Sequence, residues 1–174
     1  MNKAIVVIGG GAGGMMAAIC AARKGAHVTL LDPNERLGKK VNITGKGRCN
    51  VTSDSDVREF LPFVRHNGRF LYSSLYAFPP SAAMELFEQL GVPLKTERGR
   101  RVFPQSDRAA DVLAALRDYA RDAEFVRGSA EKLLLDAGYR PFVAGETLNP
   151  GDKVYYNNRG KAIMLAVIGS EPLS

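Results

Sequence analysis

A glycine-rich turn near the N-terminus is the feature that most constrains the fold of this chain. Gly9, Gly11 and Gly14 have the spacing G-x-G-x-x-G and follow the apolar, β-branched run at residues 4–8. That run predicts a strand buried on both faces of a parallel sheet. Apolar residues recur at helical spacing after the turn and stop at Gly25, which predicts a helix. A strand, a glycine turn and a helix in this order indicate an α/β fold.

An acidic residue completes the pattern. A second strand is predicted over residues 28–31, and Asp32 stands at its end, 18 residues after Gly14. Glycines at this spacing allow a tight turn, a close approach of a pyrophosphate and close helix–strand packing. The helix start offers N–H groups to phosphates, and a carboxylate accepts ribose hydroxyls. We therefore predict dinucleotide binding. The alternatives are a glycine turn that binds nothing and an Asp32 that only begins a turn before Pro33.

The rest of the chain predicts further helices and strands. Residues 33–55 are loop-like, and residues 56–76 are ambiguous but partly helical. The following elements are then predicted: a helix from Pro80 to Gly91, extended chain over 92–104 with a turn at Arg98-Gly99, a helix capped by Asp107 that ends near Asp122, a short helix over 129–137, and strands at 153–156 and 161–168 around a turn at 157–160.

Charge and composition exclude several classes of function. The net charge of +6 is concentrated in a glycine-rich segment that holds Arg36, Lys39, Lys40, Lys46 and Arg48. No aromatic residue is interleaved there to stack bases, so we expect a small anionic ligand and no nucleic acid. The apolar runs are far shorter than the roughly 20 residues of a membrane helix, which predicts a cytoplasmic protein without membrane contact.

The segment at residues 36–52 resembles one specific family. It contains the pattern G-[RK]-K-x-x-x-T-G-x-G-R-C-N-[VL]-[TS] without a gap, and related features continue through Arg69–Ser73 and Arg100–Pro104. The chain is similar over about residues 1–122 to bacterial NAD(P)/FAD-dependent oxidoreductases. The resemblance implies a Rossmann-like FAD-binding domain with a parallel sheet. It also implies FAD as cofactor, with NADH or NADPH as a candidate electron donor and a small-molecule substrate that the sequence does not identify.

The same resemblance implies which residues contact the cofactor. The adenosine is expected on Asp32, the pyrophosphate on the glycine turn, and the flavin ring beside the Thr44–Asn50 segment. Arg48 is expected to stabilise anionic reduced flavin, with pairing to an acid as the alternative, and Cys49 is expected to pack rather than react. The expected cofactor-binding residues are Gly9, Gly11, Gly14, Asp32, Lys40, Thr44, Gly45, Gly47, Arg48, Cys49 and Asn50, and no catalytic residue is assigned.

The end of the chain resembles a different family. Residues 127–174 are similar to the N-terminal region of aspartyl-aminopeptidase-like zinc metallopeptidases, through segments such as Pro150–Ile163. This tail holds no histidine or cysteine, and its acids lack ligand spacing, so we expect no metal site and no peptidase activity. Cys20 is expected in the core of its helix.

The two resemblances together predict two partial domains, 1–122 and 127–174, joined near residues 124–127. The first is expected to be an incomplete FAD-binding part that does not return to its sheet after Asp122, and the second a short helix-plus-hairpin tail. We therefore predict a truncated flavoprotein oxidoreductase. The alternatives are a flavin- or nucleotide-binding module without turnover and a non-catalytic fusion fragment. The exposed edge of the incomplete sheet predicts self-association.

Overall fold

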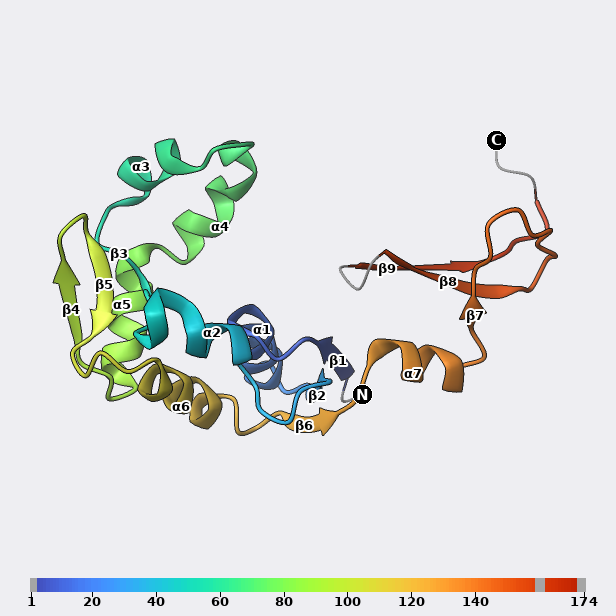
Figure 1. Cartoon of the computed structure of the whole chain (residues 1–174), viewed down its shortest axis with the longest axis horizontal. Coiled ribbons are helices and arrows are strands. Elements are labelled where there is room, and N and C mark those ends of the chain that lie inside the picture. Colours follow the sequence, from blue (N-terminus) through green and yellow to red (C-terminus); the bar gives the residue numbers. More distant parts are fainter. Residues whose placement is uncertain (1–2, 159–161, 172–174) are drawn as a thin grey trace. The chain divides into compact units, whose positions relative to one another are not determined.

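The structure of this chain is a computed structural model that describes residues 3–158 and 162–171 (Figure 1). It divides into two compact units, residues 1–127 and residues 128–174. The predicted domains, 1–122 and 127–174, have limits close to this division. Their assignment to an incomplete cofactor-binding part and a peptidase-like part stays a prediction.

The first unit mixes helices and strands in an order close to the predicted one. Its elements are β1 (Ala4–Ile8), α1 (Ala12–Ala22), β2 (His27–Asp32), α2 (Lys39–Ile43), η1 (Thr44–Gly47), β3 (Thr52–Ser53), α3 (Val57–Phe60), η2 (Leu61–Phe63), η3 (Gly68–Leu71), α4 (Tyr72–Ala77), α5 (Pro80–Gln89), β4 (Leu94–Glu97), β5 (Arg101–Pro104), α6 (Ala109–Tyr119) and β6 (Glu124–Arg127). Residues 56–76 are partly helical, as predicted. Residues 33–55 are not wholly loop-like, because α2 and η1 form there.

A parallel sheet with the order β1-β2-β6 organises this unit. β1 pairs with β2 from Ala4 opposite His27, and β2 pairs with β6 from Thr29 opposite Glu124. The predicted α/β class with a parallel sheet is therefore confirmed. The expectation that the chain does not return to the sheet after Asp122 is wrong, because β6 pairs along β2 over four residues.

The burial of the first strand differs from the prediction. The side chains of Val6 and Ile8 in β1 are 54% and 63% exposed, whereas Leu30 in β2 is 1% exposed. β2 lies between two strands, but β1 has one described neighbour and forms an edge of the sheet. A strand buried on both faces needs cover on each face and strands on each side. β1 is therefore a half-covered edge strand in this structure.

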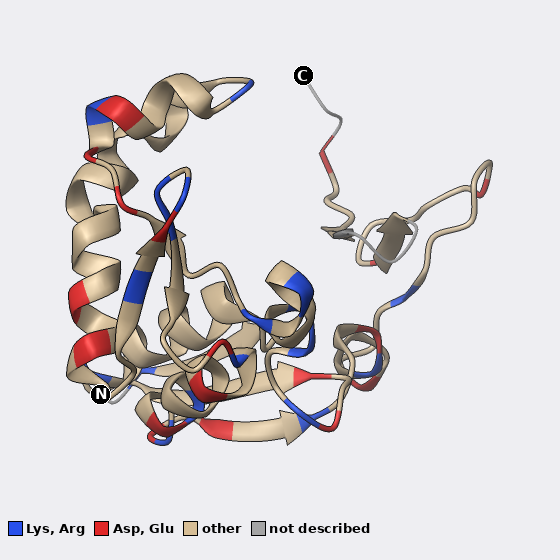
Figure 2. Ribbon diagram, turned by 60° about the vertical axis from the view of Figure 1, so that its left-hand side comes forward, with Lys and Arg blue, Asp and Glu red and all other residues tan. Residues whose placement is uncertain are grey.

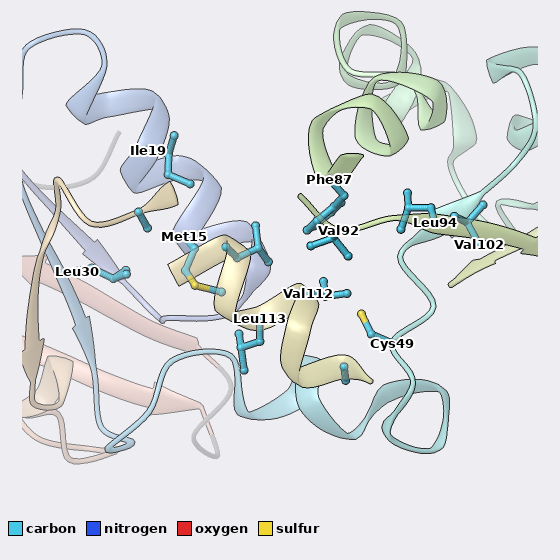
Figure 3. Close-up of a cluster of buried hydrophobic side chains, with 13 residues drawn as sticks. Met15, Ile19, Leu30, Cys49, Phe87, Val92, Leu94, Val102, Val112 and Leu113 are labelled. Atoms are coloured by element: carbon cyan, nitrogen blue, oxygen red, sulfur yellow. The ribbon is translucent and has the colours of Figure 1, made fainter. Parts of the chain in front are cut away.

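A second, antiparallel sheet has the order β3-β5-β4. β4 and β5 pair from Leu94 opposite Pro104 to Glu97 opposite Arg101, so the chain turns between them at residues 98–100, as predicted. α1, α5, α6 and this hairpin contribute side chains to one hydrophobic cluster (Figure 3). Met15 and Val102 are fully buried in that cluster. The core thus joins the parallel sheet to the antiparallel hairpin within the first unit.

The start of α6 differs from the sequence prediction in one residue. Asp107 does not cap the helix, because Arg108 occupies the N-cap position. Asp107 has a φ of +56°, and its carboxylate accepts hydrogen bonds from Arg48 Nε and Lys95 Nζ at 2.8 and 2.6 Å. Asp107 is therefore part of an ion-pair cluster rather than a helix cap.

The second unit consists of a short helix and a three-stranded sheet. Its elements are α7 (Ala130–Asp136), β7 (Arg140–Pro141), β8 (Lys153–Asn158) and β9 (Ala162–Val167). β8 and β9 pair antiparallel from Lys153 opposite Val167, which agrees with the predicted hairpin, and β7 joins β8 in parallel. The predicted turn at 157–160 lies partly outside the described residues.

No helix within residues 3–158 and 162–171 has the length and apolar character that a membrane crossing needs.

Two isoleucines of the first unit provide a matched test of this packing. Ile19 in α1 is 3% exposed, and Ile8 in β1 is 63% exposed. We predict that Ile19→Ala lowers the free energy of unfolding by about 2–5 kcal/mol, because it leaves a cavity in the cluster. Ile8→Ala should cost much less. The measurement is urea denaturation of both variants, and equal losses would contradict this placement of the core.

Candidate functional site

The turn between β1 and α1 brings two backbone segments into direct contact. The Gly9 N–H donates to Leu31 O over 2.8 Å, and Gly9 has a φ of +103°, which side chains disfavour. A Cβ atom on Gly14 would lie 1.7 Å from Gly9 O, so this approach requires glycine. A Cβ atom on Gly11 would meet no atom within 4 Å. The turn therefore combines a tight bend, close helix–strand packing and open space beside the backbone.

The first turn of α1 supplies the electrostatics of an anion site. The helix begins at Ala12, directly after Gly11, and its first turn carries no acidic side chain. The first N–H groups of a helix have no acceptor within the helix and carry a partial positive charge. A diphosphate is the kind of ligand that such a helix start binds.

Asp32 lies at the end of β2 and is bonded to the glycine turn. Its Oδ2 atom accepts a hydrogen bond of 2.6 Å from the Gly10 N–H, and its Oδ1 atom accepts two of 2.8 Å from Asn34. Burial by itself raises the pKa of this carboxyl, but the bonds from the Asn34 backbone, the Gly10 backbone and the Asn34 side chain outweigh it. The net effect is a lowered pKa. A carboxylate has about four acceptor positions, and these three hydrogen bonds use three of them.

A cavity of about 620 Å³ adjoins the loop that follows Asp32. Its lining includes four cationic side chains, from Arg36, Lys39, Arg117 and Arg127. Figure 2 shows basic residues on α2, which forms part of this wall. The four cations give this cavity, which lies beside the loop after Asp32, a basic wall that suits an anionic ligand.

Sequence reasoning did not single out Arg117 and Arg127. Arg117 of α6 donates from Nη2 to Leu37 O over 2.7 Å, and Arg127 of β6 pairs with Glu35 at 3.3 Å. Each reaches the loop after β2 from 80 or more residues away in the chain. No local pattern marks such residues, because only the tertiary fold brings α6 and β6 beside that loop.

The Thr44–Asn50 segment follows an unusual backbone path. Gly45, Lys46, Gly47 and Cys49 all have positive φ, at 56°, 60°, 85° and 60°. The Cys49 N–H donates to Thr44 O over 3.1 Å, which closes the segment into a compact loop. With its amide nitrogen facing the carbonyls, the Asn50 side chain donates to Thr52 O at 2.9 Å and Val102 O at 3.1 Å.

This loop and the glycine-turn helix meet at a second, apolar cavity of about 270 Å³. Its lining includes Ala12 of α1 and four residues that the sequence predicts at the cofactor: Lys40, Thr44, Cys49 and Asn50. Gly45 packs closely on its surroundings, since a Cβ atom there would lie 3.2 Å from Phe103. Gly47 lies in the same loop with no such contact. The cavity thus lies between the Thr44–Asn50 loop and the start of α1 at Ala12.

Arg48 points into a cluster of charged side chains rather than into either cavity lining. It forms ion pairs with Glu97 and with Asp107, the latter at 2.6 Å, and its guanidinium lies 4.2 Å from the centre of the Phe103 ring. The hydrogen bond from Arg48 lowers the pKa of Glu97. The hydrogen bond from Lys95 and, second to it, the one from Arg48 lower the pKa of Asp107. Pairing with acids is the alternative that the sequence leaves open for Arg48.

The two cysteines differ in environment. Cys49 is 5% exposed and points toward Val112 of α6 (Figure 3). Burial raises the pKa of its thiol more than the hydrogen bond with Thr44 lowers it, which favours the expected packing role. Cys20 is exposed, so its expected place in the core is wrong. The hydrophobic cluster that Met15 and Ile19 join does not include Cys20.

Comparison with known proteins gives relatives of this chain. A 3-dehydro-bile acid delta(4,6)-reductase from Clostridium scindens is 40% identical over 118 residues, which are 67% of this chain and 28% of the reductase. A probable M18 family aminopeptidase from Clostridium acetobutylicum is 37% identical over 78 residues, 42% of this chain and 16% of the aminopeptidase. The crystal structure of THI4 from Thermovibrio ammonificans aligns with a TM-score of 0.46 and 15% identity, over 72% of this chain and 38% of that one.

A family match covers most of the first unit and extends past it. Residues 3–133 match the HI0933-like protein Rossmann domain, so the match includes β6 and continues beyond the expected limit at Asp122. Because the match covers more than half of its residues, the chain belongs to the HI0933-like Rossmann domain family, and the predicted flavoprotein family with FAD as its cofactor is confirmed.

Proposed function

We propose that residues 3–133 of this chain are an FAD-binding part of a flavin-dependent oxidoreductase. The observation that carries the proposal is the meeting of two separate parts of the predicted site. The start of α1, through Ala12, and the Thr44–Asn50 loop line the same cavity, while Asp32 bonds to the glycine turn at Gly10. A family match over residues 3–133 supports the same cofactor.

Each part of the site has a defined task in this proposal. The N–H groups at the start of α1 bind the diphosphate, and Asp32 accepts a hydrogen bond from the adenosine ribose. Lys40, Thr44, Cys49 and Asn50 line the apolar cavity in which we place the flavin end. FAD, when bound, supplies the hydride and electron transfer, so the chain needs no nucleophile of its own.

FAD binding without turnover is the second candidate function. The chain spans 28% of the length of the reductase relative that it matches, and an oxidoreductase also needs sites for the donor and the substrate. NADH or NADPH is the proposed donor. Residues 3–158 and 162–171 contain no cluster of three or more histidine, cysteine or acidic groups placed to hold a metal ion.

The visible absorption spectrum of the purified chain tests the proposal directly. We predict flavin bands from bound FAD, released on heating and identified by chromatography, and uptake of added FAD by any empty fraction. Bleaching of these bands by NADH or NADPH without oxygen favours the oxidoreductase over the binding module. A colourless chain that takes up no added FAD would refute FAD binding.

Two neighbouring glycines provide a matched test of the diphosphate site. A Cβ atom on Gly14 collides with Gly9 O, whereas one on Gly13 meets no atom within 4 Å. We predict that Gly14→Ala weakens FAD binding by about tenfold or more, equivalent to about 1.4 kcal/mol, because the turn must open. Gly13→Ala, which adds a methyl group without a clash inside the chain, should bind FAD more tightly than Gly14→Ala does. Quenching of flavin fluorescence measures both, and equal affinities would contradict the assigned role of Gly14.

Protonation of Asp32 gives a prediction for pH dependence. Its folded-state pKa is lowered, so its carboxylate stabilises the chain above the ordinary value of about 3.9, and this contribution is lost as pH falls through the folded value. We predict that Asp32→Asn lowers the free energy of unfolding by about 1–3 kcal/mol at pH 7, with a smaller difference below pH ~4. Asp118→Asn, at an exposed carboxylate, is the control for urea denaturation. If the stability difference between Asp32→Asn and the parent grows as the pH falls, the stabilising role assigned to the Asp32 carboxylate is contradicted.

A further inference from the structure

Four charged side chains form a closed cluster beside the Thr44–Asn50 loop. Arg48 contacts Glu97 and Asp107, and Lys95 contacts the same two acids at 3.7 and 2.6 Å. We propose that Lys95, Glu97 and Asp107 are positioning residues, which hold this loop in its flavin-site conformation through Arg48. The part of this inference that concerns FAD rests on the proposed function. The part that concerns the conformation of the loop does not.

The backbone of the loop explains why it needs an external restraint. Lys46 and Cys49 both have a φ of +60°, a region that residues with side chains rarely adopt. Such conformations persist when the surrounding structure determines them, and they gather at binding sites. Arg48 lies between these two residues, so a fixed Arg48 side chain restrains the segment that contains both.

The partners of Arg48 are themselves well anchored. Glu97 ends β4, and Asp107 follows β5, so both acids come from the antiparallel hairpin and its connection to α6. The Phe103 ring beneath the guanidinium is 3% exposed in the core cluster. Isolated surface ion pairs contribute little, but a network with a planar guanidinium between two acids and an aromatic ring has a defined geometry. The hairpin therefore provides the rigid support and the loop is the supported part.

The charges of the cluster cancel. Two cations, Arg48 and Lys95, face two carboxylates, Glu97 and Asp107, so the cluster as a whole presents no net charge to a ligand. Arg48 consequently acts through its position and its planar fork rather than as a counter-charge for reduced flavin. Arg48→Lys keeps the positive charge but removes the planar fork. This substitution therefore distinguishes a positioning role of Arg48 from a charge role.

Alkylation of Cys49 reports the loop conformation without FAD. In the full chain with Cys20→Ser, we expect iodoacetamide to modify Cys49 at least about tenfold faster in Glu97→Gln and Asp107→Asn than in the parent, because the 5% exposed thiol becomes accessible. Glu59→Gln, which removes an acid from the separate pair with Arg100, should match the parent. Parent-like rates in both cluster variants would overturn the proposal. Thermal denaturation shows whether each variant is folded, and a cluster variant that alkylates rapidly only because it is unfolded counts against the proposal.

FAD affinity tests the second part of the inference. We expect Arg48→Lys to weaken FAD binding as much as Arg48→Gln does, and FAD bound to Glu97→Gln to show altered visible circular dichroism that Glu59→Gln does not show. Parent-like affinity of Arg48→Lys would overturn the positioning role in favour of a charge role. If the parent binds no FAD, the proposed function fails, and Cys49 alkylation alone decides whether the cluster positions the loop.

Discussion

The contact between Gly14 and the Gly9 carbonyl is the constraint on which the first unit depends. With 1.7 Å between a Cβ atom at Gly14 and that oxygen, no other residue lets α1 pack this closely on β1. The same approach places the start of α1 beside the end of β2, where the Gly10 N–H meets the Asp32 carboxylate. One packing requirement therefore sets both the fold of the βαβ unit and the position of its anion site.

The second part of the site depends on a different kind of support. The Thr44–Asn50 loop has no regular strand or long helix of its own, and its backbone includes four residues with positive φ. Contacts with the β4–β5 hairpin hold it instead. Arg48 of the loop contacts Phe103 and Glu97, and the Asn50 side chain donates to Val102 O. The antiparallel sheet thus supports the Thr44–Asn50 loop, which lines the apolar cavity.

The two edge strands of the parallel sheet, β1 and β6, expose apolar side chains. β1 has one described neighbour and exposes Val6 and Ile8, and β6 at the other edge exposes Phe125 and Val126. Neither edge carries a proline within its strand. An apolar edge whose backbone pairs with no further strand among residues 3–158 and 162–171 favours pairing with another strand, and this is the physical argument behind the predicted self-association.

The sequence by itself determined the βαβ unit, the cofactor family and the hairpin of the second unit, because each depends on local patterns: glycine spacing, β-branched runs and the G-R-C-N signature. Only the tertiary structure decided the partners of Arg48, the contributions of Arg117 and Arg127, the exposure of β1 and the place of β6. Asp107 illustrates the reason. Its local sequence favours a helix cap, but Lys95 and Arg48 approach it from 12 and 59 residues away, and charge pairing across the fold outweighs that local preference.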